Sequence, residues 1–192
     1  MMGMPRPEHM ELEDWMLERR VVFLRGEIDH VSGSRVCVQM LYLQQIDAAR
    51  PVTLVVDSPG GGVDDGLAVY DIVRHLAPLV RTHCDGRAEG MAAIVVAAGA
   101  RGRRTAVPEA RFRLMECNPD AAVETGEAAE LRARGTAQTN EMLRKVVAKA
   151  TGRPEALIAE RMREGRSMRA AEAVALGLID ALVEEPWRAS GG

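Results

Sequence analysis

A continuous apolar run that ends in a glycine-rich loop constrains the fold more than any other feature of the sequence. Residues 52–57 read VTLVVD, and they are followed by SPGGG and then by DDGLAVYDIVRHL. A run so rich in β-branched residues is typical of a strand that is covered on both faces. The segment after the glycines has acidic residues at its start, where a helix dipole favours them. We therefore predict a strand, a tight glycine loop and a helix.

The same order recurs along the chain and predicts an α/β fold. A short strand at 80–84 precedes the small-residue segment MAAIVVAAGA, which we expect to be helical. Strand, helix, strand, helix in this order places a parallel sheet between layers of helix. We place the start of an earlier helix at Ser34, because the preceding Ser-Gly-Ser supplies an N-cap. We expect a first strand that begins at residue 20 and further strands at 52–57, 80–84, 104–108, 111–116 and 178–185. The expected helices lie at 34–49, 64–76, 91–100, 126–151, 154–164 and 169–176.

Length, charge and cysteine spacing limit the classes of protein. The chain has 192 residues, 47% of them hydrophobic, which suits one domain, placed at 20–192 after an N-terminal segment at 1–19. A net charge of −3 offers no general attraction for nucleic acid, and no apolar run reaches the roughly 18 residues of a membrane helix. Cys37, Cys84 and Cys117 form no CxxC pattern, so no disulfide framework and no metal cluster is indicated. We expect a cytoplasmic protein without a cofactor, a nucleic-acid partner or a membrane partner.

The glycine loop lies where open α/β sheets place their ligand sites, after the carboxyl end of a strand. Consecutive glycines let backbone N–H groups turn outward, and the following helix adds a partial positive charge. Such a loop can hold a carbonyl oxygen, a phosphate or nothing. It matches neither GxGxxG nor GxxxxGK[ST], so nucleotide binding has little support.

Four segments together resemble the ClpP family, the proteolytic subunit of the caseinolytic (Clp) protease. They are SPGGGVDDGLAVYDIVRHLAP, GRAEGMAAIVVAAGARGRR, VPEARFRL and RSMRAAEAVALGLIDALV. The resemblance runs from about residue 20 to residue 183. It implies a ββα spiral core of the crotonase-like superfamily, a projecting handle helix at about 126–151, and heptameric rings stacked in pairs around a closed chamber.

The residues at the family's catalytic positions cannot do its chemistry. ClpP enzymes use a Ser-His-Asp triad, because a serine hydroxyl attacks only when an imidazole removes its proton and a carboxylate orients the imidazole. The resemblance places these positions at Gly90, Met115 and Arg161. It also implies that the backbone N–H groups of Gly61 and Met91 form the oxyanion hole. We therefore expect a subunit that retains carbonyl donors and lacks the triad.

Two alternative chemistries use other residues of the same region. Glu89 and Glu116 could serve as acid and base in a crotonase-like reaction of an acyl-CoA. Cys117 could replace the nucleophile of a weakly active peptidase, since two-residue spacing puts it on the strand face of Met115. All four histidines of the chain precede the elbow at Gly90, so no histidine follows where the family needs a base.

Partner surfaces also depart from the family pattern. The N-terminal segment is mostly polar and predicts a reduced axial loop. Thr53, Val55 and His75 stand where the family places aromatics that dock the unfoldase ATPase, so docking of a Clp ATPase is doubtful. The long helix at 126–151 carries an apolar stripe, and we expect another subunit to bury it. We expect an oligomer, formed with itself or with an active ClpP paralogue.

Overall fold

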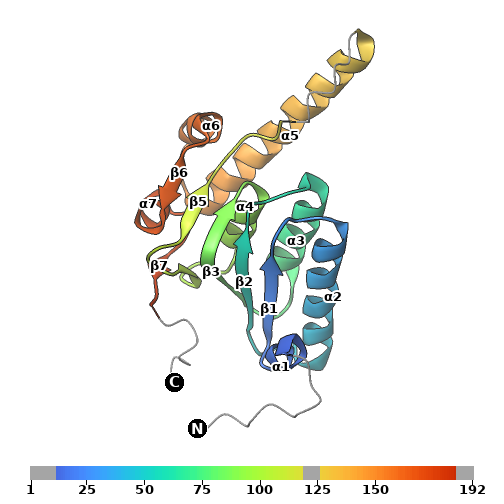
Figure 1. Ribbon diagram of the computed structural model, residues 1–192, viewed down its shortest axis with the longest axis vertical. Coiled ribbons are helices and arrows are strands. Elements are labelled where there is room, and N and C mark those ends of the chain that lie inside the picture. Colours follow the sequence, from blue (N-terminus) through green and yellow to red (C-terminus); the bar gives the residue numbers. More distant parts are fainter. Residues whose placement is uncertain (1–11, 119–125, 185–192) are drawn as a thin grey trace.

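The computed structural model describes residues 12–118 and 126–184, which form a mixed α/β structure (Figure 1). A seven-stranded sheet is flanked by helices, which confirms the expected fold class. The elements in chain order are α1 (Leu12–Glu18), β1 (Val21–Arg25), α2 (His30–Ile46), β2 (Val52–Ser58), α3 (Val63–His75), β3 (Val80–Glu89), α4 (Met91–Ala98), β4 (Arg104–Ala106), β5 (Arg111–Arg113), α5 (Glu127–Thr151), α6 (Glu155–Glu164), β6 (Ser167–Arg169), α7 (Ala170–Leu176) and β7 (Ala181–Leu182).

The sheet branches at β3, which is its longest strand. The main path runs β1-β2-β3-β4-β7, and all of these pairings are parallel. The first half of β3 pairs with β4, and its last three residues pair with β5 instead. This second pairing explains why β3 extends to Glu89, five residues beyond the expected end at residue 84. The extension brings the strand directly to the elbow at Gly90.

The core lies between the sheet and its helices, and helices α2 to α7 all contribute buried residues to it. Alternate residues of β1, β2 and β3 point into it, and all eight residues of α4 are buried. The small side chains of α4 let this helix pack closely against the sheet. The residues that fill the centre include Leu24, Leu54, Val56, Met40, Val69, Ile94 and Phe112.

Helix α2 begins four residues before the expected start. Its N-cap is Asp29, whose carboxylate accepts a hydrogen bond from the Ser32 N–H (2.7 Å) while Ser32 Oγ accepts one from the Asp29 N–H (2.9 Å). The prediction of Ser34 as the first residue was wrong, because an Asp and a Ser three residues apart satisfy two backbone donors and outcompete the later serine. The helix also ends at Ile46 instead of residue 49.

The N-terminal segment contains a helix that was not predicted. Helix α1 packs beside β1, and Arg20 connects them with a positive φ of 63°. The Arg20 guanidinium is buried and donates hydrogen bonds to four backbone carbonyls around the end of α2 and the start of β2, those of Leu43, Asp47, Arg50 and Pro51. These bonds hold the end of α2 and the connection that follows it against the residue that precedes β1.

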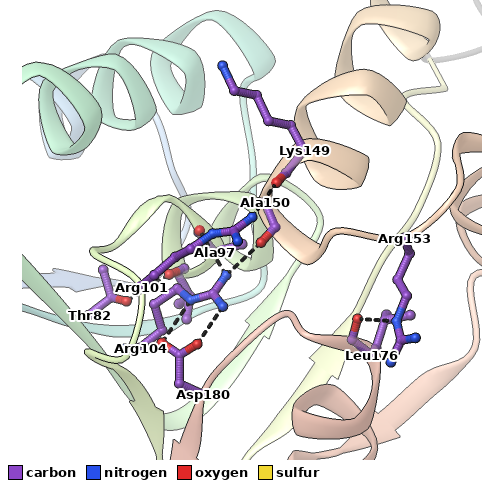
Figure 2. A network of polar contacts seen from close by, with 10 residues as sticks. Thr82, Ala97, Arg101, Arg104, Lys149, Ala150, Arg153, Leu176 and Asp180 are labelled. Carbon is purple, nitrogen blue, oxygen red and sulfur yellow. Dashed lines mark hydrogen bonds and ion pairs between the residues drawn. The ribbon is translucent and has the colours of Figure 1, made fainter.

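The C-terminal part differs from expectation in its strands. β6 was not predicted, and it pairs antiparallel with β5. The closing strand was expected at 178–185 but comprises only Ala181 and Leu182. Just before it, Asp180 forms a two-pronged ion pair with the buried Arg104 of β4, with N–O distances of 2.6 and 3.0 Å (Figure 2). Arg104 also donates to the Ala150 carbonyl of α5, so one side chain connects β4, α5 and the closing segment.

Helix α5 extends well beyond the rest of the described structure (Figure 1). Its second half packs on its own domain, where Leu143 and Val147 are buried. Leu131 (72% exposed) and Met142 (40%) are not covered. The apolar stripe expected to need a partner is therefore split between an intramolecular part and an exposed part. None of the helices in the described ranges is both long enough and apolar enough to cross a bilayer.

Candidate active site

The glycine loop after β2 is held against the segment that follows β1. Ile28 N–H donates to the Gly60 carbonyl (2.8 Å), and Gly62 N–H donates to the Ile28 carbonyl (2.7 Å). Ile28 bridges residues 60 and 62, and backbone N–H groups of successive residues in an extended chain point in opposite directions. The N–H of Gly61 is therefore directed away from Ile28. Gly60 has a φ of 90°, and a Cβ there would lie 2.6 Å from the Glu89 carbonyl. The close approach of loop and elbow therefore requires glycine.

The elbow at Gly90 is a sharp turn with a positive φ at a residue that has no side chain. Gly90 joins β3 to α4 with φ 52° and ψ −121°, and its N–H donates to the Arg113 carbonyl (2.8 Å). In α/β-hydrolases a sharp, strained turn between strand and helix presents the catalytic serine. Met91 is the first residue of α4, so its N–H has no acceptor within the helix.

Loop and elbow meet at one cavity of about 260 Å³, which we call the loop–elbow cavity. It contains both residues expected to supply backbone donors, Gly61 and Met91, and the elbow residue Gly90. Two backbone donors at one cavity are the parts from which an oxyanion site is built. The other lining residues are Pro59, Val63, Ile94, Met115, Glu116, Cys117, Asn118 and Leu143.

Met115 occupies the space beside the elbow. A Cβ built on Gly90 would lie 3.3 Å from Met115 Sδ and 3.5 Å from its Cγ. The structure therefore brings together two of the three expected triad positions, with a glycine at one and a thioether at the other. Neither group can remove or donate a proton.

Arg161, the third expected position, lies elsewhere. It is in α6, its guanidinium is 3.4 Å from Glu164, and it lines a groove with Arg166 and Glu172. Among the described residues that line the loop–elbow cavity, Arg161 does not occur. The structure does not place it with Gly90 and Met115.

The two glutamates that could act as acid and base differ in position. Glu116 lines the cavity, but its Oε1 accepts a 2.6 Å hydrogen bond from Arg144 of α5. Glu89 is at the end of β3, 3.9 Å from the Arg113 guanidinium, and is not among the described residues that line the cavity. Each carboxylate is thus partnered by an arginine.

Cys117 lines the same cavity but is not an activated thiol. Burial raises the pKa of Cys117, and the negative charge of Asp64 raises it further, so the thiolate is disfavoured at neutral pH. The expected shared strand face does not arise, because β5 ends at Arg113. The Cys117 backbone is instead fixed by the buried Asn140 of α5, whose side-chain amide bonds its N–H (2.7 Å) and its carbonyl (2.9 Å).

No histidine of the described ranges lines the cavity. His83 is buried on β3, with Nδ1 2.9 Å from Thr105 Oγ1. His30 is exposed near Asp65 (3.7 Å), and His75 Nδ1 lies 2.9 Å from the Asp71 carbonyl. His9 lies outside the described residues.

Sequence reasoning missed the side chains that position the cavity wall. Asn140 and Arg144 hold residues 116 and 117 against α5, and Arg113 Nε donates to the Gly165 carbonyl (2.7 Å) beside the elbow. One signal was present, since Asn140 interrupts the apolar face of α5 one turn before Leu143 and Arg144. No group of three or more metal-binding side chains is assembled within the described part of the chain.

The fold and the cavity define an α/β protein with a glycine loop and a hydrolase-type elbow at the carboxyl ends of its strands. The sequence model of the Clp protease family matches residues 6–186. The match covers most of the 192 residues, and the chain belongs to the Clp protease family.

Proposed function

We propose that the chain is a catalytically silent subunit of a Clp-type proteolytic assembly, with a structural or regulatory role. The observation that carries the proposal is the strained turn at Gly90, a residue without a side chain at the position where the family resemblance expects the nucleophile. The family supplies the proteolytic context. The described residues around the cavity supply neither a serine hydroxyl nor an imidazole.

The backbone N–H groups at the loop–elbow cavity could still bind a peptide carbonyl. We assign the N–H groups of Gly61 and Met91 as its donors, supported by their common cavity and by the orientation of the Gly61 N–H away from Ile28. Such donors stabilise negative charge on oxygen but do not themselves attack carbon. In a serine hydrolase, loss of the nucleophile or the base lowers kcat by about 10⁶-fold, leaving a small residual acceleration.

Hydrolysis of fluorogenic peptides tests the proposal. The purified chain should give turnover no greater than that of its Cys117→Ala variant, and neither should exceed a buffer blank measurably. Turnover by the wild-type chain that survives repurification to constant specific activity would overturn it.

A crotonase-like reaction of an acyl-CoA is the second candidate, favoured by the presence of Glu116 in the cavity. Its carboxylate would have to leave Arg144 to reach a substrate. Calorimetric titration with acetyl-CoA discriminates the two, because only this candidate predicts binding that Glu116→Gln weakens. A peptidase with Cys117 as nucleophile is the third, and it requires an activity that Cys117→Ala abolishes.

We also propose that the subunit assembles into rings, alone or with an active ClpP paralogue. Family membership supports an oligomer, and Leu131 and Met142 leave apolar surface uncovered on the projecting α5. Heptamers are the expected form. Light scattering at micromolar concentration should give a mass many times that of one chain, and a monomer would contradict the proposal.

Docking of a Clp ATPase on this subunit's own face is not part of the proposal. Of the three positions without aromatics, Val55 is fully buried, Thr53 is half-buried and His75 is exposed. They offer no large aromatic anchor of the kind that dominates protein interfaces.

A further inference from the structure

Strands β3, β5 and β6 are neighbours in the sheet (Figure 1). Each of them carries one arginine at a matching register position. Arg87 of β3 is the register partner of Arg111 in β5, and Arg111 is the register partner of Arg169 in β6. All three are exposed. Since residues in register on adjacent strands project from the same face, the three guanidinium groups form one row. We call these three residues the arginine row.

The arginine row faces outward from the core. The residues next to it in each strand, Ala88, Phe112 and Met168, are buried on the opposite face. Strand alternation therefore fixes the three arginines on the outer face.

The charges of the arginine row are not neutralised within the described structure. None of its three side chains forms an ion pair with another described residue. The next row on the same face is different, because there Glu89 lies 3.9 Å from Arg113. The nearby Glu172 is already engaged by the Arg166 guanidinium (2.8 Å) and the Arg169 backbone N–H (2.9 Å).

Like charges in direct cross-strand register destabilise a sheet, so this arrangement opposes folding unless an anion joins it. Adjacent strands are about 4.8 Å apart, which spaces the guanidinium groups for carboxylates that each bridge two of them. Acidic residues one turn apart on a helix present carboxylates at a similar spacing, about 5–6 Å between Cβ atoms. The arginine row therefore matches an acidic helix.

We propose that the arginine row is a docking site for an acidic protein segment that presents carboxylates one helical turn apart. The Glu89–Arg113 pair, one row away on the same face, places a carboxylate 3.9 Å from a guanidinium of the neighbouring strand. A protein segment is favoured over nucleic acid because the whole chain carries a net charge of −3, which repels an extended polyanion. The site is separate from the loop–elbow cavity, so the inference does not depend on whether the chain is catalytically silent.

The test uses an alanine-based helical peptide with glutamate at every fourth position, carrying a fluorescent label. Binding to the full chain is measured by anisotropy at low salt, about 0.05 M, where exposed charges are weakly screened. We expect Arg111→Gln to weaken binding about threefold and the double variant Arg111→Gln/Arg169→Gln about tenfold. Arg111→Lys, which keeps the charge and loses the two-pronged geometry, should fall between wild type and Arg111→Gln.

Two controls separate the site from general charge effects. Arg74→Gln removes an exposed arginine from the last turn of α3 and should leave the affinity unchanged. A peptide with glutamine in place of glutamate should not bind. Thermal melts establish that each variant is folded.

Three results would overturn the proposal. The first is no binding of the glutamate peptide to wild type at low salt. The second is binding that the double variant and Arg74→Gln weaken equally. The third is tighter binding of a single-stranded oligonucleotide than of the peptide, with that binding lost in the double variant. This result would make the arginine row a phosphate site.

Discussion

Replacing Gly90 by alanine tests whether the elbow keeps the strained geometry of a nucleophile position. At φ 52° and ψ −121°, an L-residue is disfavoured by about 1–3 kcal/mol. Alanine also restricts the unfolded chain, which returns about 0.4–1 kcal/mol. The added Cβ would meet Met115 Sδ at 3.3 Å, a contact that a flexible thioether relieves by a small shift. The net expectation is a loss of about 1–2 kcal/mol, or about 2–8 °C in Tm for a chain of this size.

Thermal and urea unfolding of the variant provide the measurement. Gly102→Ala is the matched control, because Gly102 also has a positive φ (75°) but no atom within 4 Å of an added Cβ. Gly90→Ala should be at least as destabilising as this control. In a double-mutant cycle with Met115→Ala, the coupling free energy should amount only to the small contact between the added Cβ and Met115. A Gly90→Ala variant as stable as wild type would refute the strained elbow.

Four further predictions concern three side chains of the fold and the cavity, Asp180, Asn140 and Cys117. Asp180→Asn should destabilise the chain by about 3 kcal/mol because Arg104 is left buried without its charge partner, whereas Glu164→Gln should change stability by less than about 0.5 kcal/mol in the same urea titration. Although partial burial opposes it, hydrogen bonding and the charge of Arg104 hold the pKa of Asp180 below its ordinary value. The difference in free energy of unfolding between wild type and Asp180→Asn should therefore be largest at pH values above the ordinary carboxyl pKa. It should disappear as the pH falls through the lowered pKa of Asp180. Asn140→Leu should cost about 2–3 kcal/mol and speed amide exchange at Cys117, since two backbone groups lose their partner. Iodoacetamide should modify Cys117 more slowly than a free cysteine peptide at pH 7, with a rate that climbs above the ordinary thiol pKa, and a rate equal to the peptide's would contradict the raised pKa.

The parts of the site that depend on local sequence could be predicted. Three consecutive glycines at 60–62 indicate a tight turn from local sequence alone, because glycine adopts positive φ without strain. The strand before them and the helix after them place this turn at the carboxyl end of the strand. The resemblance of the motifs then led to Gly61, Gly90, Met91 and Met115, which the structure places in one cavity.

The parts that depend on distant contacts could not be predicted. Residues 85–89, DGRAE, gave no strand signal, yet they belong to β3, and the last three of them pair with β5. Asn140 and Arg144 were hidden in a polar helix, and only the folded chain shows that they hold the cavity wall. Arg161 was placed by counting back from a later motif, and the structure puts it in α6, away from the cavity.

The central claim is that the loop–elbow cavity can receive a carbonyl but holds no group that attacks it. Intact-mass spectrometry after treatment with a fluorophosphonate tests this most directly. Side chain 115 reaches the Cβ position of residue 90, so Gly90→Ser/Met115→His places a hydroxyl beside an imidazole and should acquire a single phosphonyl adduct. The wild-type chain should remain at its unmodified mass under the same conditions. A wild-type adduct that maps to a residue of this cavity would contradict it.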